Sequence, residues 1–468
     1  MMSERYFLLP FNFLRLGHKE ILINEPGDLL AVPEGTALKI VERTLDDEEL
    51  YKTLCANFFI SEKPLPDLLD IYATRLREKK AFLDAGTALH IFVLTLRCNQ
   101  NCTYCQASSR KQAAGGCTMT RETMESAVKL MFRSRSPCLT MEFQGGEPSL
   151  VPDIMEYGIT LAEEINRTEQ RRMTYVLCTN CRHLTDGLLA ICRKHHVLIS
   201  TSLDGPAFIH NADRGREDSY DKTMAGIRRA RGALGDDSVS ALMTASDLAL
   251  GYPREIVDEY VNDGFRNIFL RALNPYGLAS EERDWDRYND RFIEFYKEAF
   301  EHILSINKGG YFLREGYASV ILRKMLTPLS AGFVDLQSPA GTVSSVLVYG
   351  YDGFVYASDE SRMLAESGDL TFRLGSVRDR WEDIVYGKKV RAMGKLWANE
   401  ALAGCSDCPV RAYCGADPVR NHTMQGDMYG FRPSSYVCRK NRAIIEYLLT
   451  LIAERGDEVL PVFRSWLR

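Results

Sequence analysis

The stretch LHIFVLTLRCNQNCTYC, residues 89–105, joins an apolar segment to a loop that holds three cysteines. Residues 89–96 have the composition of a β-strand, and Cys98, Cys102 and Cys105 follow directly. Three thiolates on one short loop can hold three irons of a cubane cluster and leave the fourth iron without a protein ligand. The alternatives are buried structural thiols or part of a zinc site, although zinc usually takes four ligands and nothing near the loop supplies a fourth.

Five further apolar segments follow, each separated from the next by a helical pattern. The predicted strands are LHIFVLTL, LTMEF, MTYVLCT, HVLISTSL, VSALMTA and FRNIFLRAL, with amphipathic helices such as 121–132 and 152–166 between them. Repeated strand–helix units predict an α/β fold with a parallel sheet, and six of them fit a partial (β/α)6 TIM-type barrel. In such barrels the chemistry lies at the carboxyl ends of the strands.

The chain on either side of this region predicts two further units. Residues 1–87 show three short strands (FNFLRL, EILIN and LLAV), two helices and a charged linker helix, which together predict a small winged-helix-like module. The barrel then covers 88–310. Residues 311–468 carry a helix (YASVILRKML), a hairpin-like stretch (SSVLVYGYDGFVYAS), a second cysteine group and a terminal amphipathic helix (RAIIEYLLTLIAER).

Composition excludes several classes of protein. The net charge is −5 over 468 residues with no long block of either sign, which argues against nucleic-acid binding through bulk positive charge. No apolar stretch reaches the roughly 18 residues that span a bilayer, and the N-terminus lacks the features of a signal peptide. We therefore expect a cytoplasmic protein without membrane contacts. Its 13 cysteines, which in a reducing compartment suggest metal or redox chemistry, are the unusual feature.

A second motif follows the next predicted strand. Gln144-Gly145-Gly146-Glu147-Pro148 combines two glycines, which let the backbone approach a ligand, with a carboxylate that can accept hydrogen bonds from an ammonium group. A Gly-Gly turn alone is weak evidence, but its position one strand after the cysteine loop strengthens it.

The ordered set CNQNCTYC, GGEP, Thr179-Asn180 and Ser202-Leu203-Asp204-Gly205-Pro206 resembles the radical S-adenosylmethionine (SAM) superfamily. The resemblance implies that Cys98, Cys102 and Cys105 ligate a [4Fe-4S] cluster. It also implies SAM contacts: Tyr104 beside the adenine, Gly145, Gly146 and Glu147 on the methionine amine, Asn180 and Ser202 on the cofactor, and Arg214 or Arg271 on its carboxylate. Either arginine could instead form a structural ion pair.

One position departs from the pattern of the family. Relatives often show Thr-Asn-Gly where this chain has Thr179-Asn180-Cys181, which creates a Cys178-x2-Cys181 pair. Cysteines so close together at one strand end more often pack or face solvent than bind metal.

The second cysteine group, Cys405-x2-Cys408-x5-Cys414 with Cys438 downstream, supplies four thiols, enough to saturate a zinc ion or a cluster. Behind a radical SAM barrel it resembles the SPASM extension, whose full form carries seven cysteines for two auxiliary clusters. The three ligands missing here fall on Ser338, Ser358 and Pro418, and all belong to the first auxiliary cluster. The resemblance therefore implies one auxiliary [4Fe-4S] cluster, held by the four cysteines that remain.

The N-terminal module resembles the PqqD-like elements that bind leader peptides by adding a strand to a sheet edge. The alternative is a simple cap on the barrel. LPFNFLRL near the start and CGADPVRNHTMQGDMYGFRPSSYVC near the end are similar to the maturases of His-Xaa-Ser peptide systems, the HxsB group.

These resemblances imply a peptide-modifying radical SAM oxidoreductase. SAM cleavage would yield a 5′-deoxyadenosyl radical, and the expected outcome is an intramolecular crosslink in a precursor peptide that carries a leader. A one-electron donor such as flavodoxin or ferredoxin is the other expected partner. The alternatives are a thioether-forming or epimerising maturase, a dehydrogenating enzyme of the same superfamily, and a zinc-stabilised non-catalytic binding protein. The sequence does not identify a catalytic base.

Overall fold

A nine-stranded sheet forms the centre of the computed structural model, which describes residues 6–280, 283–394 and 398–468. The strand order is β14-β12-β11-β10-β9-β6-β16-β17-β18. The first six strands in this order run parallel: β6 (Leu89–Thr95), β9 (Cys138–Gly145), β10 (Arg172–Thr179), β11 (Leu198–Ser202), β12 (Val239–Ala245) and β14 (Leu270–Ala272). The prediction of an α/β fold with a mostly parallel sheet is thus confirmed.

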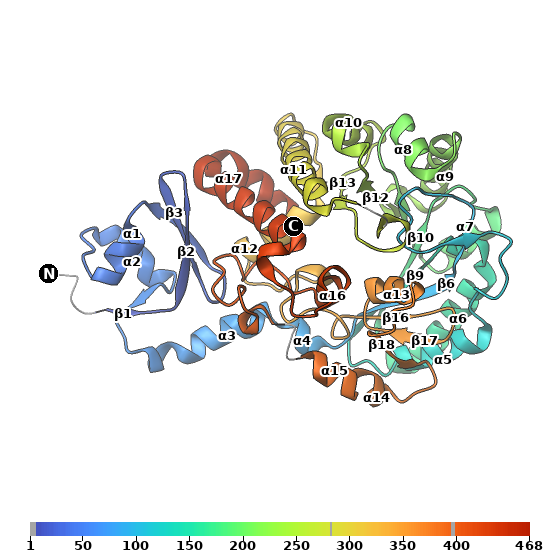
Figure 1. Cartoon of the computed structure of the whole chain (residues 1–468), viewed down its shortest axis with the longest axis horizontal. Helices are drawn as coiled ribbons and strands as arrows, with labels where there is room; N and C mark the ends of the chain where they lie inside the picture. The colour runs from blue at the N-terminus through green and yellow to red at the C-terminus, as the bar shows by residue number, and fades with distance from the viewer. Residues whose placement is uncertain (1–5, 281–282, 395–397) are drawn as a thin grey trace.

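Helices connect these strands and cover the sheet (Figure 1). They are α5 (Arg121–Met131), α6 (Pro152–Glu169), α7 (Asp186–Lys194), α8 (Ala207–Arg214), α9 (Ser219–Leu234), α10 (Pro253–Asn262) and α11 (Trp285–Lys308). Helix α5 begins where the Thr120 side chain accepts a hydrogen bond from the Thr123 amide, and it buries one apolar stripe that includes Met124, Val128 and Met131. The stripe spacing is the 3.6-residue period that predicted the helix.

The last predicted barrel strand divides into two pieces. Residues Asn267–Ile268 (β13) pair with Arg314–Glu315 (β15), whereas β14 continues the central sheet beside β12. At the start of β14, the Leu270 amide donates a hydrogen bond to the buried Glu315 carboxylate, which also caps α12 (Gly316–Leu326). The break therefore anchors the start of the C-terminal segment against the end of the sheet.

The C-terminal segment extends the same sheet. The predicted hairpin is present as β16 (Val346–Tyr349) and β17 (Phe354–Tyr356), and β18 (Arg373–Ser376) follows. Strand β16 also pairs in parallel with β6, with Val346 opposite Leu89. The remaining helices are α13 (Asp359–Glu366), α14 (Trp381–Val385), α15 (Lys388–Met393), α16 (Pro418–Gln425) and α17 (Tyr436–Trp466).

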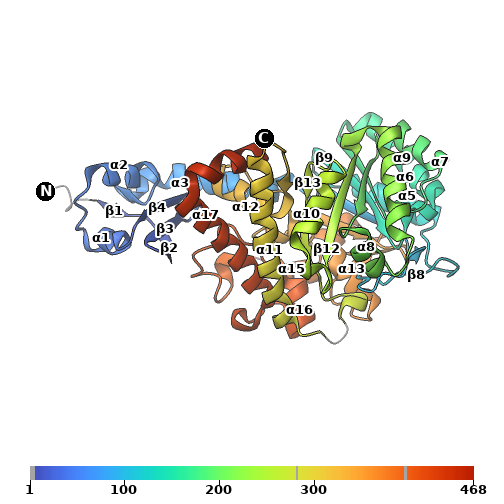
Figure 2. The ribbon, with the colours of Figure 1, turned by 90° about the horizontal axis from the view of Figure 1, so that it is seen from above.

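Helix α17 is longer than predicted. It begins at Tyr436, six residues before the predicted start at Arg442, because the Ser435 side chain accepts the Cys438 amide, and it continues past non-helical backbone at Arg455. It lies between the N-terminal module and helices α11 and α12 (Figure 2).

The N-terminal module has a core of its own. Strands β2 (Phe11–Leu16), β3 (Lys19–Asn24) and β4 (Leu29–Pro33) form an antiparallel sheet, as predicted, beside α1 (Thr36–Glu42) and α2 (Glu48–Ala56). A short pair, β1 (Phe7–Leu8) with β5 (Ile60–Ser61), was not predicted. Helices α3 (Leu69–Lys79) and α4 (Phe82–Ala85) lead to the central sheet. Residues 1–5 of the first predicted segment lie outside the described residues.

Among the described helices, none combines the length and apolar character that a membrane span requires.

Candidate functional site

The three cysteines that follow β6 all line a central cavity of about 730 Å³. Residues 97–98 form a short strand, β7 (Arg97–Cys98), beside β8 (Arg110–Lys111), and the chain then turns through Cys102 and Cys105. Burial, with smaller contributions from Glu147 and from the neighbouring Cys102 and Cys105, raises the pKa of the Cys98 thiol to about 12. Cys98 therefore lies close to both other thiols, and it would ionise only when a strong positive charge, such as a metal centre, compensates it.

The two glycines of the second motif are required by close packing against this loop. The Gly146 amide donates to the Thr95 carbonyl at 2.8 Å, so the end of β9 runs beside the end of β6. A Cβ atom at Gly145 would lie 2.1 Å from the Thr95 oxygen, and one at Gly146 would lie 2.4 Å from the Arg97 oxygen. Both glycines line the cavity directly beneath the cysteine loop.

Glu147 is buried, and its carboxylate is hydrogen-bonded within the protein. Its carboxylate accepts hydrogen bonds from the Ser149 amide (3.1 Å), the Thr179 hydroxyl (2.6 Å) and the Asn180 amide (2.8 Å). Burial raises the pKa of Glu147, and these hydrogen bonds partly offset that rise. The side chain thus ties the end of β9 to the end of β10, and unlike Gly145 and Gly146 it does not line the cavity.

Asn180 does line the cavity, and its side chain donates to the Asn99 side chain of the cysteine loop at 2.7 Å. The next residue, Cys181, has φ of +57°, a left-handed conformation that glycine adopts without strain. This explains the preference for glycine at the equivalent position. Cys181 is buried, with its carbonyl packed against Gly226.

A buried ion pair supports the cysteine loop from the side of β11. Asp204 accepts two hydrogen bonds from Arg214, at 2.6 and 2.8 Å, and another from the Tyr104 hydroxyl at 2.9 Å. Burial alone would raise the pKa of Asp204, but the Arg214 guanidinium outweighs it and lowers the pKa. The Arg214 Nη1 atom also lies 3.8 Å from the Cys102 sulfur.

The two candidate arginines consequently differ. Arg214 is held by Asp204 and stacks over the Tyr104 ring, although part of it reaches the cavity. Arg271, on β14, also lines the cavity, and among the described residues no hydrogen bond or ion pair engages its side chain. Ser202 lines the cavity between them. The sequence motif contains Asp204 but assigns it no role, because its ion pair with Arg214 is visible only in the folded structure.

Part of the cavity wall comes from the C-terminal segment. Asp335, Glu360, Arg420 and Lys440 line it together with Tyr317. Burial, with Asp335 and Asp359 nearby, raises the pKa of Glu360 to about 7, whereas burial and the Arg420 charge lower the pKa of Lys440 to about 8. Sequence reasoning missed this part of the wall because its five members come from five separate elements.

The second cysteine group lies where the 402–414 loop meets the start of α17. Burial raises the pKa of Cys438 to about 11, and Cys414, Cys405 and Cys408 each add to the rise, so the four thiols are mutual neighbours. The buried Lys324 donates to the Cys414 carbonyl at 3.0 Å and to the Leu336 carbonyl at 2.7 Å. This loop is therefore tied to the segment that forms the cavity wall.

Neither cysteine group resembles the ligand set of a single ion. Across residues 6–280, 283–394 and 398–468, no three His, Cys, Asp or Glu side chains converge closely enough to hold one metal ion. A cluster distributes its ligands over several iron atoms, so its thiols need not meet at one point.

The three positions at which the sequence lacks cysteines serve local structure. Ser358 caps α13, because its hydroxyl accepts the Ser361 amide in a reciprocal capping box. The Ser338 hydroxyl accepts the Asn399 amide at 2.8 Å. Pro418 occupies the first turn of α16, where its missing amide hydrogen costs nothing.

Comparison with known proteins agrees with this arrangement. The profile of the radical SAM superfamily matches residues 92–255, which span the cysteine loop, the Gly-Gly turn and the Asp204–Arg214 pair. Residues 92–255 therefore form a radical SAM domain. A domain of this family implies a [4Fe-4S] cluster and SAM.

This chain is similar to proteins whose names refer to a sulfatase or to a precursor peptide. It is 23% identical over 338 residues to a cysteine-type anaerobic sulfatase-maturating enzyme of Clostridium perfringens, which covers 66% of this chain and 86% of that protein. The structure of native anSMEcpe with bound AdoMet has a TM-score of 0.63 at 19% identity, over 80% of this chain and 100% of that one. Streptococcus suis SuiB bound to the precursor peptide SuiA has a TM-score of 0.54 at 13% identity, over 92% and 98%. At these identities the two structures establish the shared fold alone.

Proposed function

We propose that this radical SAM enzyme modifies a ribosomally synthesised precursor peptide by forming an intramolecular crosslink. The observation that carries the proposal is the lining of the central cavity. The three thiols of the first loop line it, and so do residues of the C-terminal segment, which also holds the four-thiol group. Such a cavity can hold a substrate beside the first cluster and next to the segment that would carry the second.

The residues around the first cysteine loop fit the cofactors of the superfamily. Cys98, Cys102 and Cys105 would hold a [4Fe-4S] cluster with one open iron, and Gly145 and Gly146, which pack against the loop and line the cavity, are the proposed backbone contacts of SAM. Together these cofactors supply a carbon-centred radical that removes a hydrogen atom from a substrate C–H bond.

The remaining residues around this loop hold the site in shape. Glu147 ties the strand ends together and does not line the cavity, so we assign it a positioning role in place of the expected contact with the methionine amine. Asn180, Ser202 and Arg271 face the cavity and are the proposed polar contacts of SAM. Tyr104 and Arg214 form the Asp204-anchored side wall, beside the proposed adenine and carboxylate positions.

The four-thiol group is proposed to hold one auxiliary [4Fe-4S] cluster in a SPASM-type extension. Its support is chemical: Cys405, Cys408, Cys414 and Cys438 are mutual neighbours, and four thiolates saturate a cubane. Ser338, Ser358 and Pro418 have structural roles instead, so one auxiliary cluster is proposed and not two.

The N-terminal module is the proposed binding site for the leader of the peptide. Strands β2 and β4 are the outer strands of its three-stranded sheet, and an extended peptide can pair with an outer strand through main-chain hydrogen bonds. The module is fixed to the second cysteine loop, since the Tyr413 hydroxyl donates to the Gly27 carbonyl at 2.9 Å and Arg411 pairs with Glu25. A leader bound there would be tethered close to the cavity-forming segment.

We further propose the division into 1–87, 88–310 and 311–468, with the middle unit a partial (β/α)6 barrel. Flavodoxin or ferredoxin is the proposed electron donor in the cytoplasm. The substrate class proposed is that of His-Xaa-Ser peptide systems, on the two sequence strings that resemble their maturases.

Co-expression with the short open reading frames beside its gene tests the function. The crosslink predicts a peptide lighter by two hydrogens in which no cysteine thiol has been consumed. A thioether would show the same mass loss with one thiol protected from alkylation, and an epimerised peptide would show no change in mass. Zinc without iron in anaerobically purified protein would contradict the enzymatic proposal altogether.

A further inference from the structure

One side chain connects the second cysteine group to the central cavity. Asn441, on α17, is buried, and its Nδ2 atom donates to the Cys414 sulfur at 3.7 Å. Its Oδ1 atom accepts a hydrogen bond of 2.8 Å from the Tyr317 hydroxyl. Because Tyr317 lines the cavity, a chain of two hydrogen bonds joins the cavity wall to a sulfur of the proposed auxiliary cluster.

The orientation of the Asn441 amide is set by its tyrosine partner. Burial, and the nearby Cys414, raise the pKa of Tyr317 well above its usual value, so the hydroxyl keeps its proton and acts as a donor. An amide that accepts this bond through its oxygen must turn its NH2 group in the opposite direction, toward Cys414. The same hydrogen bond that holds Tyr317 therefore aims an N–H at the sulfur.

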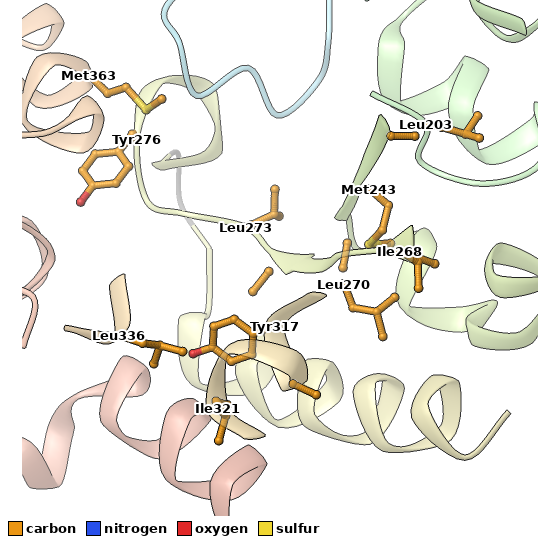
Figure 3. Close-up of a cluster of buried hydrophobic side chains, with 14 of the residues drawn as sticks. Leu203, Met243, Ile268, Leu270, Leu273, Tyr276, Tyr317, Ile321, Leu336 and Met363 are labelled. Carbon is orange, nitrogen blue, oxygen red and sulfur yellow. The ribbon is translucent and has the colours of Figure 1, made fainter. Parts of the chain in front are cut away.

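The surroundings keep this link rigid. Tyr317 belongs to α12, which packs against α17, and its ring lies near Ile321 and Leu336 with the hydroxyl turned toward Leu336 (Figure 3). The Lys440 ammonium lies 5.3 Å from the centre of the ring on its cavity side. Lys324 fixes the carbonyl of Cys414, so backbone and side chain of this cysteine are both held.

We propose that Asn441 is a positioning residue that sets the reduction potential of the auxiliary cluster, and that Tyr317 makes this potential sensitive to the cavity. This inference rests on the proposed auxiliary cluster. Hydrogen bonds to the sulfurs are a principal determinant of iron–sulfur potentials. An N–H directed at a thiolate stabilises the added electron of the reduced cluster, and therefore raises the potential.

The test is a redox titration of the auxiliary cluster, followed by electron paramagnetic resonance. All variants carry Cys98→Ala, so that the first cluster is removed and one signal remains. Asn441→Leu preserves the volume of the side chain and removes the N–H, and we expect the potential to fall. Tyr317→Phe leaves the N–H in place without its polarising partner, and we expect a smaller fall.

Tyr447→Phe is the matched control. It removes a tyrosine hydroxyl from α17, the helix that carries Asn441. That hydroxyl bonds to Glu301 and Tyr447 does not line the cavity, so the potential of the cluster should stay at the parent value. An Asn441→Leu potential equal to that of the parent would overturn the inference while leaving the cluster established. A parent protein without iron would instead overturn the auxiliary cluster, and the inference with it. If Asn441→Leu does not fold, an unchanged potential in Tyr317→Phe overturns the role given to the link.

Discussion

The two cysteine groups of this enzyme differ in how they are built. The first takes three thiols from one loop after β6, and the buried Arg214–Asp204 pair lies against it. The second takes three thiols from a loop and one from α17, and a neutral amide, Asn441, reaches one of its sulfurs. Three donors leave a coordination position open, whereas four close the site.

Under the proposed function, this difference would separate reactivity from electron storage. An open site must be shielded and shaped for a second ligand, and the glycines, the buried Glu147 carboxylate and the charged side wall around Cys98, Cys102 and Cys105 fit that requirement. The proposed closed site would need no such shaping, and its neighbours would act on its potential instead.

Cysteine removal should affect the two sites differently. Cys98→Ala should lose about four irons per chain and abolish SAM cleavage, because the open iron is lost. Cys414→Ala should also lose about four irons but still cleave SAM, without forming peptide product. Iron analysis and quantification of 5′-deoxyadenosine by chromatography check both results. Equal SAM cleavage in the two variants would contradict the proposal that only the three-thiol site binds SAM.

Stability should depend more on the charged side wall of the first site than on the amide of the second. Asp204→Asn leaves the buried Arg214 without its counter-charge, and such a loss typically costs about 3–5 kcal/mol. Asn441→Leu leaves a buried tyrosine hydroxyl unpaired, at a cost of about 1–3 kcal/mol. Urea unfolding of iron-free protein measures both, and a larger cost for Asn441→Leu would reverse the comparison.

The glycines of the two sites should tolerate alanine to different extents. At Gly145, φ is +134° and the new Cβ would meet a backbone oxygen at 2.1 Å, so Gly145→Ala should cost about 3 kcal/mol or more. At Gly404 the nearest atom, at 2.9 Å, belongs to the flexible Arg432 side chain, and we expect about 1 kcal/mol. Urea unfolding midpoints compare the two, and similar costs would show that the first site is not tightly packed.

The first site should also make stability depend on pH through Asp213, whose carbonyl accepts the Thr103 amide of the cysteine loop. Burial, and then the Asp204 charge, raise the pKa of Asp213 to about 7. The folded state therefore holds a proton that the unfolded chain releases near pH 4, so stability falls as pH rises between these values. Between about pH 4 and pH 6 the fall should be about 2–3 kcal/mol.

Asp213→Asn should remove this part of the pH dependence. Asp407→Asn, at the exposed edge of the second cysteine group, is the control and should leave the profile of the parent. Unfolding curves recorded across this range provide the measurement. A profile for Asp213→Asn that follows the parent would show that its carboxyl is ionised in the fold.

The sequence predicts elements whose pattern is local. Six strands, the 346–356 hairpin and the three-stranded module follow from runs of apolar residues and turns, and both cysteine groups are visible as spacings. The pairing of β16 with β6 joins residues about 250 positions apart, and no local pattern encodes it. The same holds for the site. The cysteines are visible as spacings in the sequence, but the Asp204–Arg214 ion pair and the Tyr317–Asn441 hydrogen bond join residues that meet only in the folded chain.

The most direct test of the account is whether SAM perturbs one cluster and not the other. In reduced Cys414→Ala protein, where the three-thiol cluster remains, added SAM should change the electron paramagnetic resonance spectrum, because SAM binds the open iron. In reduced Cys98→Ala protein, where the four-thiol cluster remains, the spectrum should stay the same. A spectrum that changes with SAM in Cys98→Ala would contradict the assignment of an open and a closed site. So would a spectrum that stays the same with SAM in Cys414→Ala.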